Sequence, residues 1–390
     1  MKLKHDERLQ LGKVKILSFL SLVLGLSQGL FLYVMSTYFK DAARTDNIGI
    51  FYLLSFAVVL FALLNLHKII KKIGKSDFFY ASIFFKVITI IVLLFTSPGP
   101  LGIMAVIIYN IFIDFQWVGM DMLLEAYSSD RASGRIRGVF LVAQNIGLLL
   151  SPLISAAVLD EYGYYGIFFL LLVSNVFVLL FGAFTIGKTN HVFHGRLGAW
   201  DVVKKAMRRS DIRRIFYISF VLDFFFALMI IYTPLYLLDY GFTWKDLGVI
   251  FTVMLLPFVF VQYPAGLLAD KKLGEKEMLI LSIVLMGFST LAIYFITSKS
   301  LWVWAAVLFV TRIGAALIQI LRDSYFYKRI DGHDVDLNNF FRTSYPLGYI
   351  FGAFLSAGLL LFFPLKVMFI LIAVVVLSAL LPAFFLEDNL

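Results

Sequence analysis

The 390-residue sequence contains no cysteine, and this absence excludes several kinds of chemistry. A chain without cysteine has no disulfide bonds, no thiolate metal ligands and no cysteine nucleophile. Histidine is also scarce, because its five copies are scattered and their spacing matches no metal-binding pattern. We therefore expect neither a metal ion nor another cofactor.

Charged residues are few as well, at 15% of the sequence, whereas soluble domains have about 25%. Hydrophobic residues reach 61%, which is typical of an integral membrane protein. The net charge of +9 would favour nucleic acid only if lysine and arginine shared an accessible folded face, but they lie in short segments between apolar runs. We expect membrane lipids as partners and no nucleic acid.

Apolar runs that can cross about 30 Å of hydrocarbon occur twelve times. The first run follows a basic amino terminus, as in a signal peptide, but it can span a bilayer and lacks an A-x-A cleavage site, so we expect it to be retained. The predicted fold is therefore an all-α integral membrane protein. Its predicted helices cover residues 16–39, 47–66, 78–96, 101–124, 138–159, 165–187, 214–239, 246–268, 277–297, 301–322, 337–362 and 366–386.

Lysine and arginine are concentrated in alternate loops. One side of the membrane holds both termini and 26 of the 34 lysine and arginine residues. Because cytoplasmic loops carry the excess of positive charge, both termini are predicted to be cytoplasmic. We expect a monomer in a bacterial inner membrane or a plasma membrane.

The longest polar break, residues 188–213, divides six predicted helices from six. Within it an amphipathic helix is expected, with Leu197, Trp200, Val203 and Met207 on one face. Basic residues surround this face, so the helix can lie on anionic headgroups, although a solvated charged linker fits nearly as well. The predicted domains are residues 1–187, a cytoplasmic linker at 188–213, and residues 214–390.

The two halves also match each other in sequence at displacements of 198 to 201 residues. The matching positions are Gly49 with Gly248, Gly74 with Gly274, Glu125 and Tyr127 with Asp323 and Tyr325, and Gly147, Ser151 and Ser155 with Gly348, Gly352 and Ser356. Each match alone is weak, but their common order is hard to obtain by chance. We infer a parallel duplication that gives two pseudo-symmetric six-helix bundles.

One predicted helix carries acids where hydrocarbon is expected. Asn110, Asp114, Asp121 and Glu125 are spaced to lie on one helical face. A carboxylate inside the membrane is costly unless it is protonated, paired or facing water, so these residues indicate a substrate or ion pathway. Pairing that serves only the structure is the alternative.

Two short motifs match functional patterns but lie in the wrong structural context. Residues 182–189, GAFTIGKT, fit the phosphate-binding loop, but they end a predicted transmembrane helix where that loop needs a strand before it. Residues 25–29, GLSQG, fit the hydrolase pattern G-x-S-x-G, but they lie in the middle of the first predicted helix. Close packing of small residues explains the second motif better.

Residues 266–276 read GLLADKKLGEK, directly after the eighth predicted helix. With one extra residue this segment resembles the G-x-L-A-D-R/K-x-G-R/K-R/K loop of the major facilitator superfamily, and the six-plus-six helices and long linker resemble that family too. The first-half copy, residues 66–75, keeps the basic residues and Gly74 but has Leu66 and Ile70 where the motif has glycine and aspartate.

The resemblance implies that the first, fourth, seventh and tenth helices line a central cavity. Their polar residues are the candidates for a substrate or ion pathway: Gln28, Asn110, Asp114, Asp121, Asp223, Arg312 and Gln319. For Gln28 and Gln319, hydrogen bonds between helices are an equal alternative. Asp223 lies beside a run of phenylalanines and is a candidate for carrying a coupling proton.

A cytoplasmic gate is also implied, in which Asp270 caps the helix that begins near Arg135. The gate candidates are Gly266, Asp270, Gly274, Glu125, Asp323 and Arg135, and the secondary candidates are Lys86, Arg342, Gln144 and Asn145. Lys86 can reach the membrane interface or neutralise an acid of the fourth helix. Asp114 and Arg312 occupy equivalent positions in the repeat, so they can also pair across the cavity.

These features predict a secondary active transporter that moves a small molecule by alternating access, coupled to protons. The substrate class stays open: one arginine among acids suits an anionic or zwitterionic solute, and the aromatic helices suit an amphipathic one. The rival classes are a non-transporting receptor or scaffold and a membrane-embedded enzyme. No enzyme is expected, because the sequence offers no nucleophile-base or metal cluster.

Overall fold

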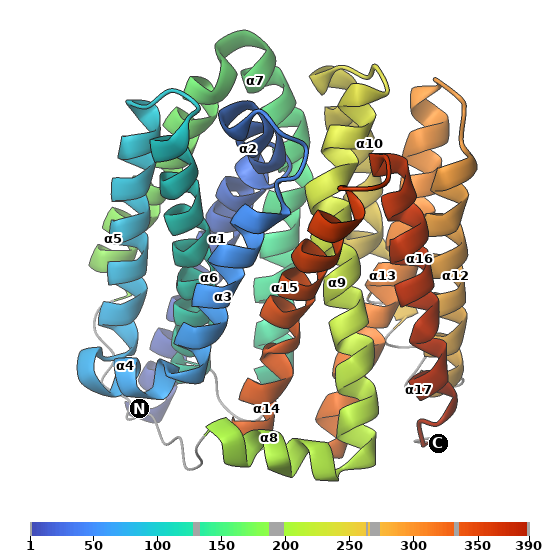
Figure 1. The fold of residues 1–390 in the computed structure, drawn as a ribbon. Coiled ribbons are helices and arrows are strands. Elements are labelled where there is room, and N and C mark those ends of the chain that lie inside the picture. Colours follow the sequence, from blue (N-terminus) through green and yellow to red (C-terminus); the bar gives the residue numbers. More distant parts are fainter. Residues whose placement is uncertain are drawn as a thin grey trace. The chain divides into compact units, whose positions relative to one another are not determined.

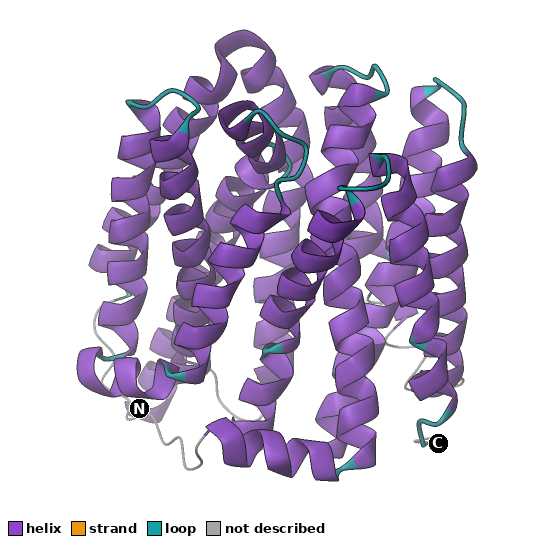
Figure 2. Cartoon of the chain, viewed as in Figure 1, coloured by secondary structure: helices purple, strands orange, loops and turns teal. Residues whose placement is uncertain are grey.

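The structure, a computed structural model, describes residues 2–127, 133–186, 199–262, 264–265, 274–330 and 335–387. Helices form nearly all of these ranges, and no strand occurs within them (Figure 2). The predicted all-α class is confirmed. The helices are α1 (Lys2–Leu32), α2 (Met35–Ala43), α3 (Gly49–Leu64), α4 (Leu66–Ile73), α5 (Lys75–Leu94), α6 (Pro100–Tyr127), α7 (Ser133–Thr185), α8 (Ala199–Arg208), α9 (Ser210–Asp239), α10 (Trp244–Phe260), α12 (Glu275–Phe295), α13 (Leu301–Arg329), α14 (Val335–Arg342), α15 (Ser344–Leu359), α16 (Met368–Ser378) and α17 (Leu380–Phe384), with a 3-10 turn at Leu365–Val367 (Figure 1).

Many of these helices are long and apolar enough to cross a membrane. Within the described ranges eight such segments occur: Gly12–Ala43, Lys75–Leu94, Pro100–Leu124, Gly138–Thr185, Ser210–Asp239, Glu275–Phe295, Leu301–Arg329 and Leu365–Phe384. Gly138–Thr185 contains the non-helical residue Gly163, with φ 60° and ψ −156°, and therefore consists of two helices. The membrane character predicted from the sequence is confirmed.

The chain divides into two compact units. Unit 1 comprises Met1–Thr45 and Asn65–His194, and unit 2 comprises Asp46–Leu64 and Gly195–Leu390. Helix α3 thus packs within unit 2, although the segments before and after it belong to unit 1. The sequence analysis assigned residues 47–66 to the first bundle, and that division into six and six helices stays a prediction.

In unit 1, small residues allow α1 and α7 to cross closely. A Cβ atom at Gly147 would lie 2.2 Å from the carbonyl oxygen of Leu22, and one at Gly25 would lie 2.3 Å from the carbonyl oxygen of Gln144. Two residues after Gly25, Ser27 accepts a hydrogen bond from the Asn175 amide at 2.8 Å. The prediction that residues 25–29 serve helix packing is therefore confirmed.

Unit 2 contains a similar crossing between α9 and α15. A Cβ atom at Gly348 would lie 2.7 Å from the backbone nitrogen of Phe224. Helix α3 packs on the other side of α15, where Gly49 leaves only 2.7 Å between its would-be Cβ and the Ala353 carbonyl. Phe56 of α3 lies against Tyr349 of α15, with ring centroids 4.1 Å apart.

Basic side chains donate hydrogen bonds to the carbonyl oxygens at the end of the last helix in each unit. In unit 1, Lys13 Nζ donates to the carbonyl oxygens of Thr185 and Ile186 at the end of α7. In unit 2, Arg214 Nη1 donates to the Phe385 carbonyl after α17, at 2.6 Å. A cation at a helix carboxyl end satisfies free carbonyls and is favoured by the helix dipole.

Helix α8 follows residues 187–198, which lie outside the described ranges. Its Val202 and Ala206 are buried, and it contacts α9 and α14 of unit 2. Met207 is 41% exposed, while Lys204, Lys205 and Arg208 are exposed or half-exposed. An amphipathic helix is therefore present at the predicted position, but its buried residues lie beside the predicted apolar stripe.

Candidate functional site

A buried ion pair joins three helices of unit 2. Asp223 lies in the middle of α9 and is 4% exposed. Its Oδ2 accepts a hydrogen bond from Ser344 Oγ of α15 at 2.6 Å and lies 3.3 Å from Arg322 Nη1 of α13. Arg322 Nη1 also donates to Ser219 Oγ at 2.6 Å, and the hydroxyl oxygens of Ser219 and Ser344 lie 2.8 Å apart. We name these four residues the Asp223 cluster.

Asp223 is a residue that the sequence predicts, whereas the other three residues of the cluster were not predicted. The tenth predicted helix ends at residue 322, whereas α13 continues to Arg329. Tyr325 and Phe326 are buried beyond that point, and Tyr325 follows the buried Leu321 by one helical turn. This periodicity is the sequence signal that would have placed Arg322 inside a helix. Ser219 lies one turn before Asp223 on the same face of α9.

Asp323, a gate candidate, follows Arg322 and is more exposed to solvent than Asp223. Its side chain is 42% exposed, and its Oδ1 lies 3.4 Å from Arg322 Nε. Arg322 therefore contacts one buried and one exposed carboxylate, and its guanidinium also lies over the Phe341 ring at 5.8 Å.

Arg312 and Gln319 lie on the same helix, α13. Arg312 is 1% exposed, and its guanidinium lies 5.0 Å from the ring centre of Phe225 and 5.6 Å from that of Phe226. Such contacts stabilise a cation in apolar surroundings. The Gln319 side chain accepts a hydrogen bond from Gln262 at 3.1 Å, which is the alternative that the sequence left open for this residue.

In unit 1 the predicted polar face of α6 lies toward α1. Trp117 shares this face with Asn110 and Asp114, and its Nε1 donates to Gln28 Oε1 of α1 at 2.9 Å. Asn110 is 8% exposed, whereas Asp114 and Asp121 are half-buried. Within the part of the chain that the structure describes, the buried atoms Asn110 Nδ2 and Asp114 Oδ2 have no hydrogen-bond partner.

Lys86 of α5 packs against a different face of α6. It is fully buried, its Nζ donates to Gln116 Oε1 at 2.5 Å, and it lies 5.6 Å from the ring centre of Tyr109. Asp114 is two residues from Gln116, about 200° around the helix, so Lys86 contacts a face of α6 other than that of Asp114. That Lys86 neutralises an acid of this helix stays a prediction.

Several predicted residues cannot be compared with the structure. Gly266 and Asp270 lie outside the described residues, and the side chains of Glu125 and Arg135 are not described.

The structure does describe the other gate and secondary candidates. Gly274, with φ 70°, precedes α12 as Gly74, with φ 93°, precedes α5. Arg342 ends α14, and Gln144 and Asn145 are half-buried on α7. The proposed Asp114–Arg312 pair would join the two units and stays a prediction.

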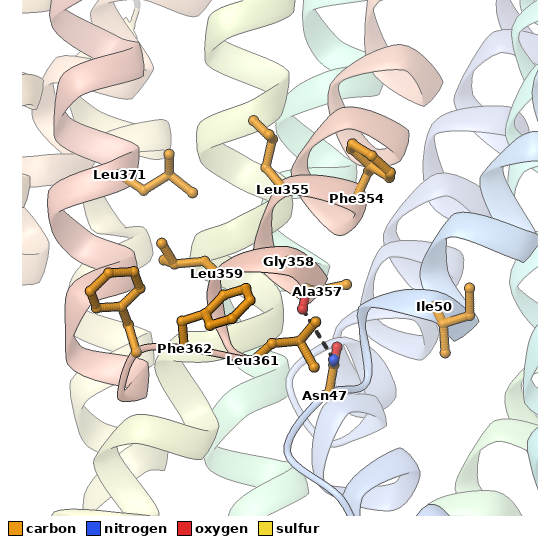
Figure 3. A pocket seen from close by; sticks show the side chains of 11 residues that line it. Asn47, Ile50, Phe354, Leu355, Ala357, Gly358, Leu359, Leu361, Phe362 and Leu371 are labelled. Atoms are coloured by element: carbon orange, nitrogen blue, oxygen red, sulfur yellow. Dashed lines mark hydrogen bonds between the residues drawn. The ribbon is translucent and has the colours of Figure 1, made fainter.

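A separate pocket of about 690 Å³ lies at the far end of α15 from the Asp223 cluster (Figure 3). Side chains from α3, α15 and α16 surround it, and nearly all are apolar, among them Ile50, Phe354, Phe362 and Leu371. The Asn47 amide donates to the Ala357 carbonyl at 3.1 Å at its edge. The pocket has no ionisable lining residue, so it suits hydrocarbon better than a polar solute. No group of three or more acidic or histidine side chains able to hold a metal ion occurs in the described ranges.

Comparisons with known proteins place this chain among membrane transporters. The family model of the Major Facilitator Superfamily matches residues 17–253 and 245–389. The crystal structure of a mutant of the nucleoside transporter NupG superimposes with a TM-score of 0.72 over 97% of this chain and 99% of that chain. At 15% identity the likeness concerns the fold alone. A search of curated protein sequences gave no match.

Proposed function

Since the chain belongs to the major facilitator superfamily and is a membrane transporter, we propose that it is a secondary active transporter that moves a small solute by alternating access, coupled to protons. Protons and the solute are its proposed partners, and the cell membrane, with both termini cytoplasmic, is its proposed location. No catalytic residue is part of this proposal.

The Asp223 cluster carries the proposal. It places the Asp223 carboxylate and the Arg322 guanidinium in apolar surroundings. Their ion pair and two serine hydroxyls connect three helices. Adding a proton to Asp223 would remove the charge that holds Arg322, so α9, α13 and α15 would lose an attraction that fixes their positions. A proton that changes contacts between helices is what coupling requires.

For alternating access we infer twelve spans in two related halves. Counting Gly138–Thr185 as two helices and adding the apolar helices α3, α10 and α15 brings the eight segments to twelve. The glycines that precede α5 and α12 share a positive φ, and the matched residues Gly147 and Gly348 each form a close crossing. Two repeats that rock against each other are the usual basis of alternating access.

The proposal does not fix the substrate. NupG, whose fold this chain shares, is a nucleoside transporter, so nucleosides are a sensible first set of solutes to test. A receptor or scaffold function fits the structure less well, because such a protein has no need for Asp223, Lys86 and Arg312 in the membrane interior.

Uptake into proteoliposomes tests the proposal. Purified protein is reconstituted, and solutes are screened with and without an imposed proton gradient. For a transported solute, Asp223→Asn should keep exchange between equal pools but lose accumulation driven by the gradient, while Asp201→Asn on the exposed surface of α8 should behave as wild type. Asp121→Asn is measured in parallel, because Asp121 is the second carboxylate that we propose as a proton carrier. If both the Asp223 and Asp121 variants accumulate solute as wild type does, neither residue couples protons.

A further inference from the structure

The Asn110–Asp114 face of α6 has two polar atoms that form no hydrogen bond with the described residues. Asn110 Nδ2 and Asp114 Oδ2 are buried and have no hydrogen-bond partner among the described residues. Their side chains lie one helical turn apart, with Cβ atoms about 5–6 Å from each other. Buried polar groups are nearly always bonded, so these two atoms on one helical face offer a donor and an acceptor to a bound molecule.

The two atoms require different hydrogen-bond partners. Asn110 Nδ2 is a donor and therefore needs an acceptor oxygen, whereas Asp114 Oδ2 is an acceptor and needs a donor. A metal ion does not satisfy this pair, because an amide nitrogen that carries hydrogens cannot bind a cation.

The charge around Asp114 favours a cation. Helix α6 contains no lysine, arginine or histidine, and the facing part of α1, Leu17–Leu32, has no charged residue. Lys86, the buried base of the neighbouring helix, is bonded to Gln116 on another face of α6. The half-buried Asp121 adds a second acid to this side of the helix.

We propose that the Asn110–Asp114 face is a binding subsite for a protonated amine that has a hydroxyl or carbonyl oxygen beside it. The amine donates to Asp114 and the oxygen accepts from Asn110, while Trp117, held by Gln28, supplies an aromatic wall one turn farther along α6. The inference rests on the proposed transport function and names the substrate group that this site takes.

The absence of cysteine makes the site testable without a known substrate. A single cysteine is introduced as Asn110→Cys and, separately, as Gln28→Cys, and each purified variant is checked for a single folded species. Each cysteine then reacts with three methanethiosulfonates of similar size that carry an aminoethyl, a hydroxyethyl or a sulfonatoethyl group. Rates are divided by those of the same reagents with a free thiol. The measurement is repeated after Asp114→Asn and, as a control of equal chemistry in unit 1, after Asp160→Asn.

We expect the aminoethyl reagent to react fastest and the sulfonatoethyl reagent slowest. Asp114→Asn should reduce the ratio of these two rates about tenfold, and Asp160→Asn should leave it unchanged. An equal ratio with and without Asp114, or no reaction of either cysteine with any reagent, would overturn the proposal. The labelling needs no transport, so a chain that selects the amine here but moves no solute in vesicles would contradict the proposed function alone.

Discussion

Asp223 and Arg322 depend on each other because both are shielded from water. Arg322→Gln would leave a buried carboxylate with only two serine hydroxyls, at a cost of about 3–5 kcal/mol of unfolding free energy. We expect Asp223→Asn to be costly as well, and the double variant to lose less than the two single losses added together. Thermal unfolding of the four proteins in detergent measures this coupling, and additive losses would show that the two charges do not interact.

Asp323 provides the matched control for this cycle. It contacts the same arginine, but its side chain is 42% exposed. Water weakens an exposed ion pair, so Asp323→Asn should change stability by about 0–1 kcal/mol.

Lys86 and Gln116 give a second prediction about buried polar pairs. Gln116→Leu alone should destabilise unit 1 by about 1–3 kcal/mol, because it leaves the buried Lys86 amine without its acceptor. The double change Lys86→Met with Gln116→Leu replaces the pair by apolar groups of similar volume and should restore or raise the unfolding temperature. A double variant less stable than Gln116→Leu would show that Lys86 has a further buried contact.

At residue scale, the sequence predicted intramembrane acids well and their partners poorly. Asp114 and Asp223 stand out because a carboxylate within an apolar run is unusual on its own. Their partners depend on where helices end and how they face each other. Arg322 was taken for a loop residue at a helix end, and Gln116 is a common polar residue whose role appears only once Lys86 packs beside it.

The close helix crossings give an element-scale prediction. Gly147→Ala would bring a Cβ atom within 2.5 Å of backbone atoms of Leu22 and Leu26, and backbone cannot move aside as a side chain can. We expect a loss of about 1–3 kcal/mol in unfolding free energy. Gly12→Ala is the control, because no atom lies within 4 Å of its would-be Cβ, and there the better helix propensity of alanine should be neutral or slightly stabilising. Equal unfolding temperatures for the two variants would argue against a tight crossing.

Helix type was easier to predict than helix limits. Long apolar runs predicted α5, α6, α9, α12 and α13 because a membrane needs about twenty apolar residues. The sequence pattern did not show that α9 begins at Ser210 and α13 extends to Arg329, since polar ends of helices look like loops. The sequence also did not predict that α3 packs against α15, because hydrophobic periodicity does not identify a partner helix.

The predicted pair between Asp114 and Arg312 concerns the whole molecule, because the two residues lie in different units. Its test compares the stability and the transport activity of variants. Each single neutralisation should impair stability or transport more than the double, and the charge swap Asp114→Arg with Arg312→Asp should recover stability relative to either single swap. Thermal unfolding and solute uptake are measured for all variants. Additive losses would leave Arg312 to act apart from Asp114.

The place of α3 also affects how the protein is made. Roughly 280 residues separate the end of α3 from the start of α15, so at about 5–20 residues per second the ribosome needs about a quarter of a minute to a minute to reach it. During that interval Gly49 and Phe56 face something other than their final neighbours. No single cut in the backbone yields two fragments that correspond to the two units, since the α3 segment is encoded between two pieces of unit 1. We therefore expect fragments split in the linker to complete unit 2 only when both are present in one membrane.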